Sequence, residues 1–137
     1  TLTSVAKSLP ALMRAQKVGK RAMRAGMDFR TAQDAIDCIA NEKAELDAAV
    51  ANGDKKNIEE ELGDLLFSCV NAARHLGVDA ELALKASTEK FINRFSVTEE
   101  LTKAEGLNMK ELPIEELDLY WDKAKSIINN TEENNND

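Results

Sequence analysis

The chain has 137 residues, enough for one domain whose core needs neither disulfides nor a structural metal. Apolar residues make up 43% and charged residues 31%, and no apolar run approaches the roughly 18 residues of a membrane-spanning helix. The formal net charge of −7 argues against general nucleic-acid binding, which depends on neutralising phosphates. Cys38 and Cys69 both fall in apolar helical patterns, which indicates reduced core thiols and a cytoplasmic protein. The chain starts at Thr1 rather than Met, so we expect it to be part of a longer protein.

Few aromatic residues, and long stretches of Ala, Leu, Glu and Lys, predict an all-α fold of about five helices. The predicted helices cover residues 9–25, 31–50, 56–76, 79–103 and 114–128. Pro10 suits the first turn of the first helix, and Gly26 suits its end. Thr31 with Asp34 three residues later resembles a capping box, and Gly53 ends the second helix.

Short connections after the second and third helices favour antiparallel neighbours, so an antiparallel helical bundle is the expected architecture. We expect residues 1–128 to form a single domain. Residues 129–137 are polar and are predicted to be a disordered tail.

Carboxylates interrupt the predicted helices at positions where apolar side chains are expected. In the second helix Glu42 lies on the same stripe as Ile39 and Leu46, and Glu45 follows three residues later. The third helix has an apolar stripe, and beside it a second ridge begins with Glu61 and Asp64, again three residues apart. The apolar stripe consists of Ile58, Leu62, Leu65, Cys69, Ala72 and Leu76. Two antiparallel helices would therefore each present a pair of carboxylates.

Facing carboxylates near a core raise each other's pKa, and a divalent cation relieves that repulsion. Ligands that are all oxygen select Mg²⁺, with Mn²⁺ as a substitute. Di-iron bundles need a Glu-x-x-His motif. The one histidine, His75, lies about three turns from Asp64, which disfavours iron. The Glu-x-x-Glu and Glu-x-x-Asp spacings are also common on solvated helix faces. The residues alone are therefore compatible both with a metal site and with a plain acidic surface.

Further along the chain, Lys90 and Arg94 lie one turn apart and bracket Phe91. This pair is either a surface feature beside a core edge or a clamp for phosphate. Trp121 is either core or a partner for a nucleotide, with Lys125 one turn further on. No Gly-rich phosphate loop and no Ser/His/Asp arrangement supports P-loop or acyl-transfer chemistry.

Together these residues resemble the MazG family of nucleoside triphosphate pyrophosphohydrolases, and most closely the C-terminal catalytic domain of bacterial MazG. The segments that carry the resemblance are LPALMRAQKVGKRA (9–22), EKAEL (42–46), EEELGDLLFSCVNAARHLG (59–77), EKFINRF (89–95) and LDLYWDKAK (117–125). The resemblance implies an all-α fold, a homodimer or larger assembly, and Mg²⁺-dependent hydrolysis of NTPs or dNTPs to the monophosphate and pyrophosphate, a house-cleaning activity on nucleotide pools.

The resemblance also implies roles for particular residues. Four carboxylates would be catalytic and hold the metal: Glu42, Glu45, Glu61 and Asp64. The substrate would be bound by Asn57, Lys90, Arg94, Trp121 and Lys125. Two positions depart from the family pattern, because Asn41 stands in place of a glutamate and Asn57 in place of a phosphate-contacting lysine.

Two other functions remain open at this point. One is a non-catalytic helical interaction module, in which the basic first helix docks on an acidic partner. The other is a related all-α pyrophosphatase restricted to dUTP, dCTP or phosphoribosyl-ATP.

Overall fold

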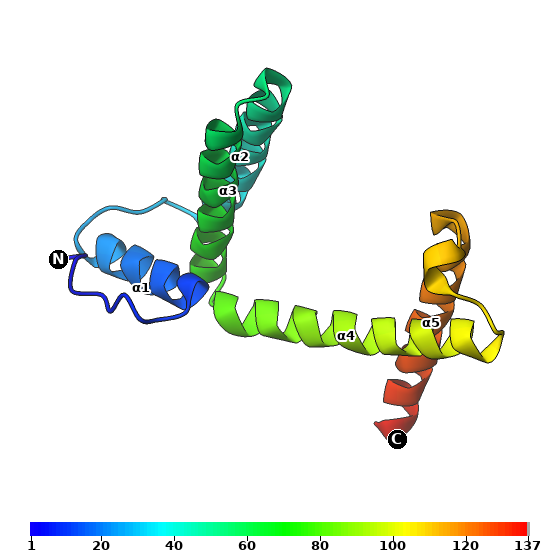
Figure 1. Cartoon of the computed structure of the whole chain (residues 1–137). Helices are drawn as coiled ribbons and strands as arrows, with labels where there is room; N and C mark the ends of the chain where they lie inside the picture. The colour runs from blue at the N-terminus through cyan, green and yellow to red at the C-terminus, as the bar shows by residue number, and fades with distance from the viewer. Residues whose placement is uncertain (137) are drawn as a thin grey trace. The chain divides into compact units, whose positions relative to one another are not determined.

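The computed structural model describes residues 1–136. It contains α1 (Ala11–Arg24), α2 (Ala32–Asn52), α3 (Lys55–His75), α4 (Ala80–Ala104) and α5 (Ile114–Asn135), with a short 3₁₀ helix at Met109–Glu111 (Figure 1). These described residues include no β-strand, so the predicted all-α class is confirmed. The chain divides into two compact units, residues 1–84 and 85–137, which are described separately below.

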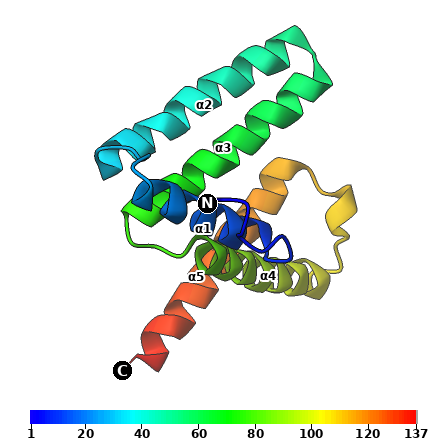
Figure 2. The ribbon, with the colours of Figure 1, turned by 90° about the vertical axis from the view of Figure 1, so that its left-hand side faces the viewer.

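The first unit is built on the α2–α3 hairpin, whose helices run side by side in opposite directions (Figures 1 and 2). Thr31 Oγ1 accepts a hydrogen bond from the Asp34 backbone N at 3.1 Å and begins α2, as its sequence predicts. Gly53 ends α2 with a φ of 69°, a conformation that suits glycine. Asp54 Oδ1 then caps α3 by accepting from the Lys56 backbone N at 3.1 Å. This tight turn sets the register in which α2 faces α3.

α1 packs against α3 at a buried glycine. A Cβ atom at Gly19 would lie 3.1 Å from Arg74 Nε and 3.2 Å from Asn71 Oδ1, so glycine permits this close approach. The turn between α3 and α4 is also tied to α1. Gln16 Nε2 donates to Val78 O and Gln16 Oε1 accepts from Ala80 N, each at 2.9 Å.

The second unit holds most of α4, the 3₁₀ helix and α5. Its core is small: in the part of this unit that the structure describes, the buried residues are Thr98, Thr102 and Ala124. Both threonines satisfy their hydroxyl groups within α4, where Thr98 Oγ1 donates to Arg94 O at 2.8 Å. Tyr120 donates a hydrogen bond to Glu105, which joins α5 to the end of α4 and raises the pKa of the Tyr120 phenol.

The structure corrects two expectations. α5 continues to Asn135, past the predicted helix end at residue 128, and Asp137 at the end of the expected tail lies outside the described residues. No Gly or Pro interrupts the segment after Pro113, and Thr131 Oγ1 donates to Ile127 O at 2.9 Å within the extended helix. The stripe expected to form the core of α3 is only partly covered, because Leu62 is 45% and Leu76 56% exposed and Cys69 is exposed as well.

Candidate active site

The predicted carboxylates of α2 and α3 come together in the first unit. Glu42, Glu61 and Asp64 each place one carboxylate oxygen within 4.8 Å of the other two. Glu42 comes from α2, and the other two lie one turn apart on α3. The short turn at Gly53 sets the hairpin register, so the juxtaposition follows from local caps combined with helix packing.

Glu61 lies in an environment that disfavours its negative charge. Its Oε2 is buried and has no hydrogen-bond partner among the described residues. Burial is the largest cause of the raised pKa of Glu61. The negative charges of neighbouring carboxylates raise it further, and these belong to Glu45, Asp64, Glu42 and Glu60. A buried carboxylate oxygen without a donor is costly, and a bound cation would satisfy it. The donor set is all oxygen, so these residues fit a hard divalent cation.

Glu45, the fourth predicted ligand, lies beside the three-carboxylate cluster rather than within it. It is close enough to raise the pKa of Glu61, and both residues line an open groove of about 700 Å³ between α2 and α3. Asn41 and Asn57 line the same groove. The two asparagines that depart from the family pattern therefore lie next to the acidic residues.

The remaining predicted substrate residues belong to the second unit. Lys90 is exposed and Arg94 is half-buried on α4. Trp121 on α5 is half-buried, and its ring centroid lies 5.3 Å from that of Phe91. Lys125 Nζ lies 3.4 Å from Asp122 Oδ1 in an exposed ion pair. These side chains share one unit and offer both cations and an aromatic face.

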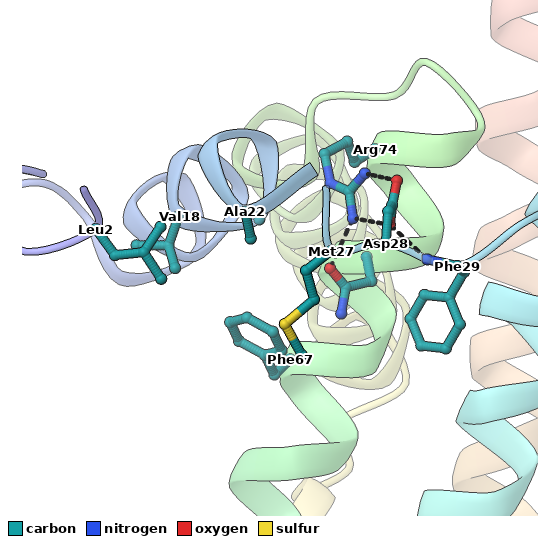
Figure 3. A pocket seen from close by; sticks show the side chains of 10 residues that line it. Leu2, Val18, Ala22, Met27, Asp28, Phe29, Phe67 and Arg74 are labelled. Carbon is teal, nitrogen blue, oxygen red and sulfur yellow. Dashed lines mark hydrogen bonds and ion pairs between the residues drawn. The ribbon is translucent and has the colours of Figure 1, made fainter. Parts of the chain in front are cut away.

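A cavity of about 420 Å³ in the first unit was not expected from the sequence (Figure 3). α1, the loop after it and α3 all contribute to its walls. Its lining is mostly apolar and includes Val18, Ala22, Met27, Phe29 and Phe67. Polar groups of Asp28, Asn71 and Arg74 meet it at one side. An apolar cavity of this size with a few convergent polar groups is typical of small-molecule sites.

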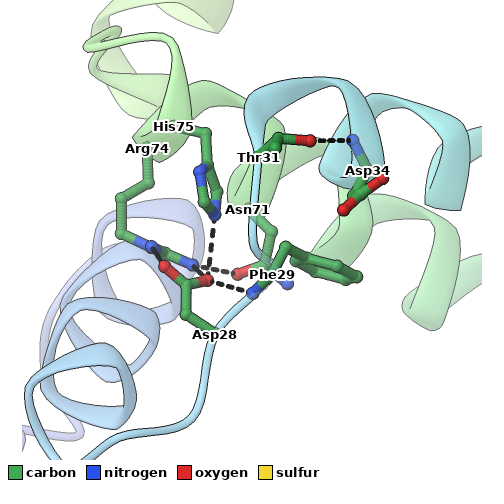
Figure 4. Close-up of polar contacts among 7 residues, drawn as sticks. All are labelled: Asp28, Phe29, Thr31, Asp34, Asn71, Arg74 and His75. Atoms are coloured by element: carbon green, nitrogen blue, oxygen red, sulfur yellow. Dashed lines mark hydrogen bonds and ion pairs between the residues drawn. The ribbon is translucent and has the colours of Figure 1, made fainter.

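The polar side of this cavity is a hydrogen-bonded network centred on Asp28 (Figure 4). Asp28 accepts from Arg74 Nη1 at 2.8 Å and from Arg74 Nη2 at 2.9 Å, and its Oδ1 lies 2.9 Å from His75 Nε2. The Phe29 backbone N donates to the same carboxylate at 2.8 Å. Hydrogen bonds from Arg74 and His75 hold the pKa of Asp28 far below its usual range, although partial burial opposes them. The sequence did not predict this network, because Asp28 and Arg74 are 46 residues apart in the chain and no local pattern connects them.

Comparison with known proteins identifies the fold. Residues 30–96 match the MazG nucleotide pyrophosphohydrolase domain. This chain belongs to the MazG family. The matched segment contains α2, α3 and all four predicted carboxylates, together with Lys90 and Arg94.

Two curated MazG relatives are similar over most of the chain. The nucleoside triphosphate pyrophosphohydrolase/pyrophosphatase MazG of Thermotoga maritima is 45% identical over 117 residues, which cover 85% of this chain and 45% of that protein. The nucleoside triphosphate pyrophosphohydrolase of Escherichia coli strain K12 is 43% identical over 126 residues, which cover 90% of this chain and 48% of that protein. The chain thus spans about half the length of the curated MazG relatives it matches. None of its described helices is both long and apolar enough to cross a membrane.

Proposed function

We propose that this MazG domain hydrolyses nucleoside triphosphates, both NTPs and dNTPs, to a nucleoside monophosphate and pyrophosphate. One water supplies the new phosphoryl oxygen, and the bond between the α- and β-phosphates breaks. The observation that carries the proposal is the three-carboxylate cluster, with the orphaned Glu61 Oε2, inside the matched family segment.

Mg²⁺ is the proposed cofactor and Mn²⁺ its substitute, because hard cations prefer carboxylate oxygens. Glu42, Glu61 and Asp64 would hold the ion, and Glu45 would lie beside it and add negative charge. When bound, the ion supplies charge neutralisation and polarises phosphoryl oxygens. Because the acidic cluster would repel a triphosphate in the absence of a cation, substrate binding should itself depend on the metal.

The cations of the second unit are proposed to bind the phosphates. Lys90, Arg94 and Lys125 would offset charge on the departing pyrophosphate, and Trp121 would contact the nucleotide. Asn57 borders the groove beside Glu61 and would donate an amide hydrogen where the family pattern has a lysine. An amide carries no charge, so its contribution to binding a polyanion should be smaller than that of a lysine.

A homodimer or larger assembly, and a cytoplasmic location, belong to the same proposal. Large apolar side chains of the α2–α3 hairpin, including Val50 and Leu62, are 59% and 45% exposed. Exposed apolar patches of this kind favour association with a partner. The free state of Cys38 and Cys69 supports a reducing compartment.

The test is pyrophosphate release from a panel of NTPs and dNTPs, with dUTP, dCTP and phosphoribosyl-ATP included, in the presence of Mg²⁺. Broad turnover supports the proposal, whereas turnover of one of the last three alone indicates a narrower pyrophosphatase. Lack of turnover of every substrate indicates a binding module. Glu61→Gln should abolish release, and Glu59→Gln, an exposed change on the same helix outside the cluster, should not.

A further inference from the structure

The cavity beside Asp28 presents two aromatic walls. Phe29 lies on the loop after α1, where its ring meets His75 edge-on at 6.2 Å, and Phe67 on α3 is 42% exposed. Apolar walls that include aromatic rings suit a flat, uncharged ring, because every nucleobase has a face that can stack on an aromatic side chain. Among the described residues that line the cavity, Asp28 and Arg74 are the charged ones, and they pair with each other and leave no net charge for a phosphate.

Asn71 supplies a side-chain amide to this cavity, and the orientation of that amide is fixed (Figure 4). Its Oδ1 accepts a hydrogen bond from Arg74 Nη2 at 3.0 Å. Since guanidinium groups only donate, the oxygen must face Arg74 and the amide nitrogen must point elsewhere. No described residue accepts a hydrogen bond from Asn71 Nδ2, so this donor remains for a ligand.

The cavity also lies near the proposed reaction site. Asn71 follows Asp64 by seven residues, so both side chains leave α3 on nearly the same face. Their separation along the helix axis is about 10 Å, at 1.5 Å per residue. Phe67, one turn after Asp64, lies between them along the helix. A nucleoside whose phosphates reach the acidic cluster would therefore extend along α3 towards the cavity.

We propose that this cavity binds the nucleobase of the substrate, and that Asn71 Nδ2 donates a hydrogen bond to a base carbonyl oxygen. The proposal rests on the proposed function and adds a preference to it. The oxygen in question is O6 of guanine or O4 of uracil and thymine, the position at which adenine and cytosine carry an amino group. Cytosine O2 lies at the opposite end of the pairing edge. Nucleotides of guanine, uracil and thymine are therefore the favoured class.

The decisive variant is Asn71→Asp. It keeps an oxygen for Arg74, replaces the amide donor with a second acceptor, and changes the shape of the side chain little. Phe67→Ala removes one aromatic wall. Asn93→Asp, the same change at an exposed position on α4, and Leu66→Ala, a truncation on α3 outside the cavity, are the matched controls.

The measurement is kcat/KM for GTP, UTP, ATP and CTP, each divided by kcat/KM for ribose 5-triphosphate, which has no base. The division removes effects of the added charge on the triphosphate. Asn71→Asp should lower the ratio for GTP and UTP about tenfold, the cost of one hydrogen bond. The same variant should leave the ratios for ATP and CTP unchanged or raise them. Phe67→Ala should lower all four ratios, and neither control should change any of them.

Unchanged ratios in both Asn71→Asp and Phe67→Ala would overturn the proposal and would favour a base site elsewhere, for example at Trp121. A second measurement does not depend on turnover. Saturation-transfer NMR of guanosine and uridine, with EDTA present, should show contact of the base protons with wild-type protein and a loss of that contact in Phe67→Ala. Contact without any hydrolysis would reject the proposed function and keep the base site. Absence of contact with wild type would reject the base site.

Discussion

Replacing Asp28 with alanine tests whether the Asp28–Arg74–His75 network stabilises the first unit. The carboxylate accepts from both terminal nitrogens of Arg74, lies within hydrogen-bond distance of His75 Nε2, and accepts from the Phe29 backbone. The side chain of Asp28 is 16% exposed and that of Arg74 is 11% exposed, so little water is available to replace these bonds. Asp28→Ala would leave a guanidinium group largely buried without its counter-charge.

A hydrogen bond to a charged group contributes about 1.5–3 kcal/mol, and breaking a buried ion pair costs about 3–5 kcal/mol. Because both side chains keep some exposure, we expect Asp28→Ala to lower the free energy of unfolding by about 3 kcal/mol. Asp47→Ala is the matched control. Asp47 pairs with Lys43 at 2.6 Å, but these side chains are 62% and 66% exposed. An exposed pair of this kind contributes only about 0.3–0.5 kcal/mol.

Urea denaturation followed by circular dichroism measures both variants. The pH dependence of the free energy of unfolding is a second test. The folded-state pKa of Asp28 lies below that of the unfolded chain, so its stabilisation is present in full above the unfolded value of about 3.9. As the pH falls below that value, the difference between wild type and Asp28→Ala should shrink. A loss in Asp28→Ala no larger than in Asp47→Ala would refute the reasoning.

Removal of divalent cations by EDTA should abolish pyrophosphate release, and either Mg²⁺ or Mn²⁺ should restore it, because the candidate ligands are all carboxylates; full activity after complete metal removal would count against the cluster as a metal site. Glu61→Gln should abolish activity while the unfolding midpoint of the metal-free protein stays the same or rises, since one like charge is removed from the cluster. Loss of activity that only follows loss of fold would contradict this. Light scattering at micromolar concentration should give a mass of at least twice 15.1 kDa, and a monomer mass would exclude the proposed assembly. Trp121 should change its fluorescence when a nonhydrolysable triphosphate binds with Mg²⁺; unchanged fluorescence alongside measured binding would remove this residue from the site.

Much of the first unit could be predicted because its determinants are local. Thr31 and Gly53 mark the ends of α2 through one side-chain cap and one left-handed backbone conformation, and both can be recognised from a few neighbouring residues. The spacing of Glu61 and Asp64 likewise places them on one helix face without knowledge of any other element. The predicted end of α5 at residue 128 was wrong. The polar composition after that residue indicates solvent exposure, and an exposed segment can still be helical.

By itself the sequence determined the helices, the hairpin turn and the spacing of the carboxylates on each helix, since caps and helical periodicity act over a few residues. Only the tertiary structure decided that Glu42 joins Glu61 and Asp64 while Glu45 lies beside them, because that depends on the register of α2 against α3. Asp28 and Arg74 are 46 residues apart in the chain, and no local rule pairs them. The cavity they border exists because Gly19 lets α1 approach α3, a packing contact between distant segments that helix periodicity cannot specify.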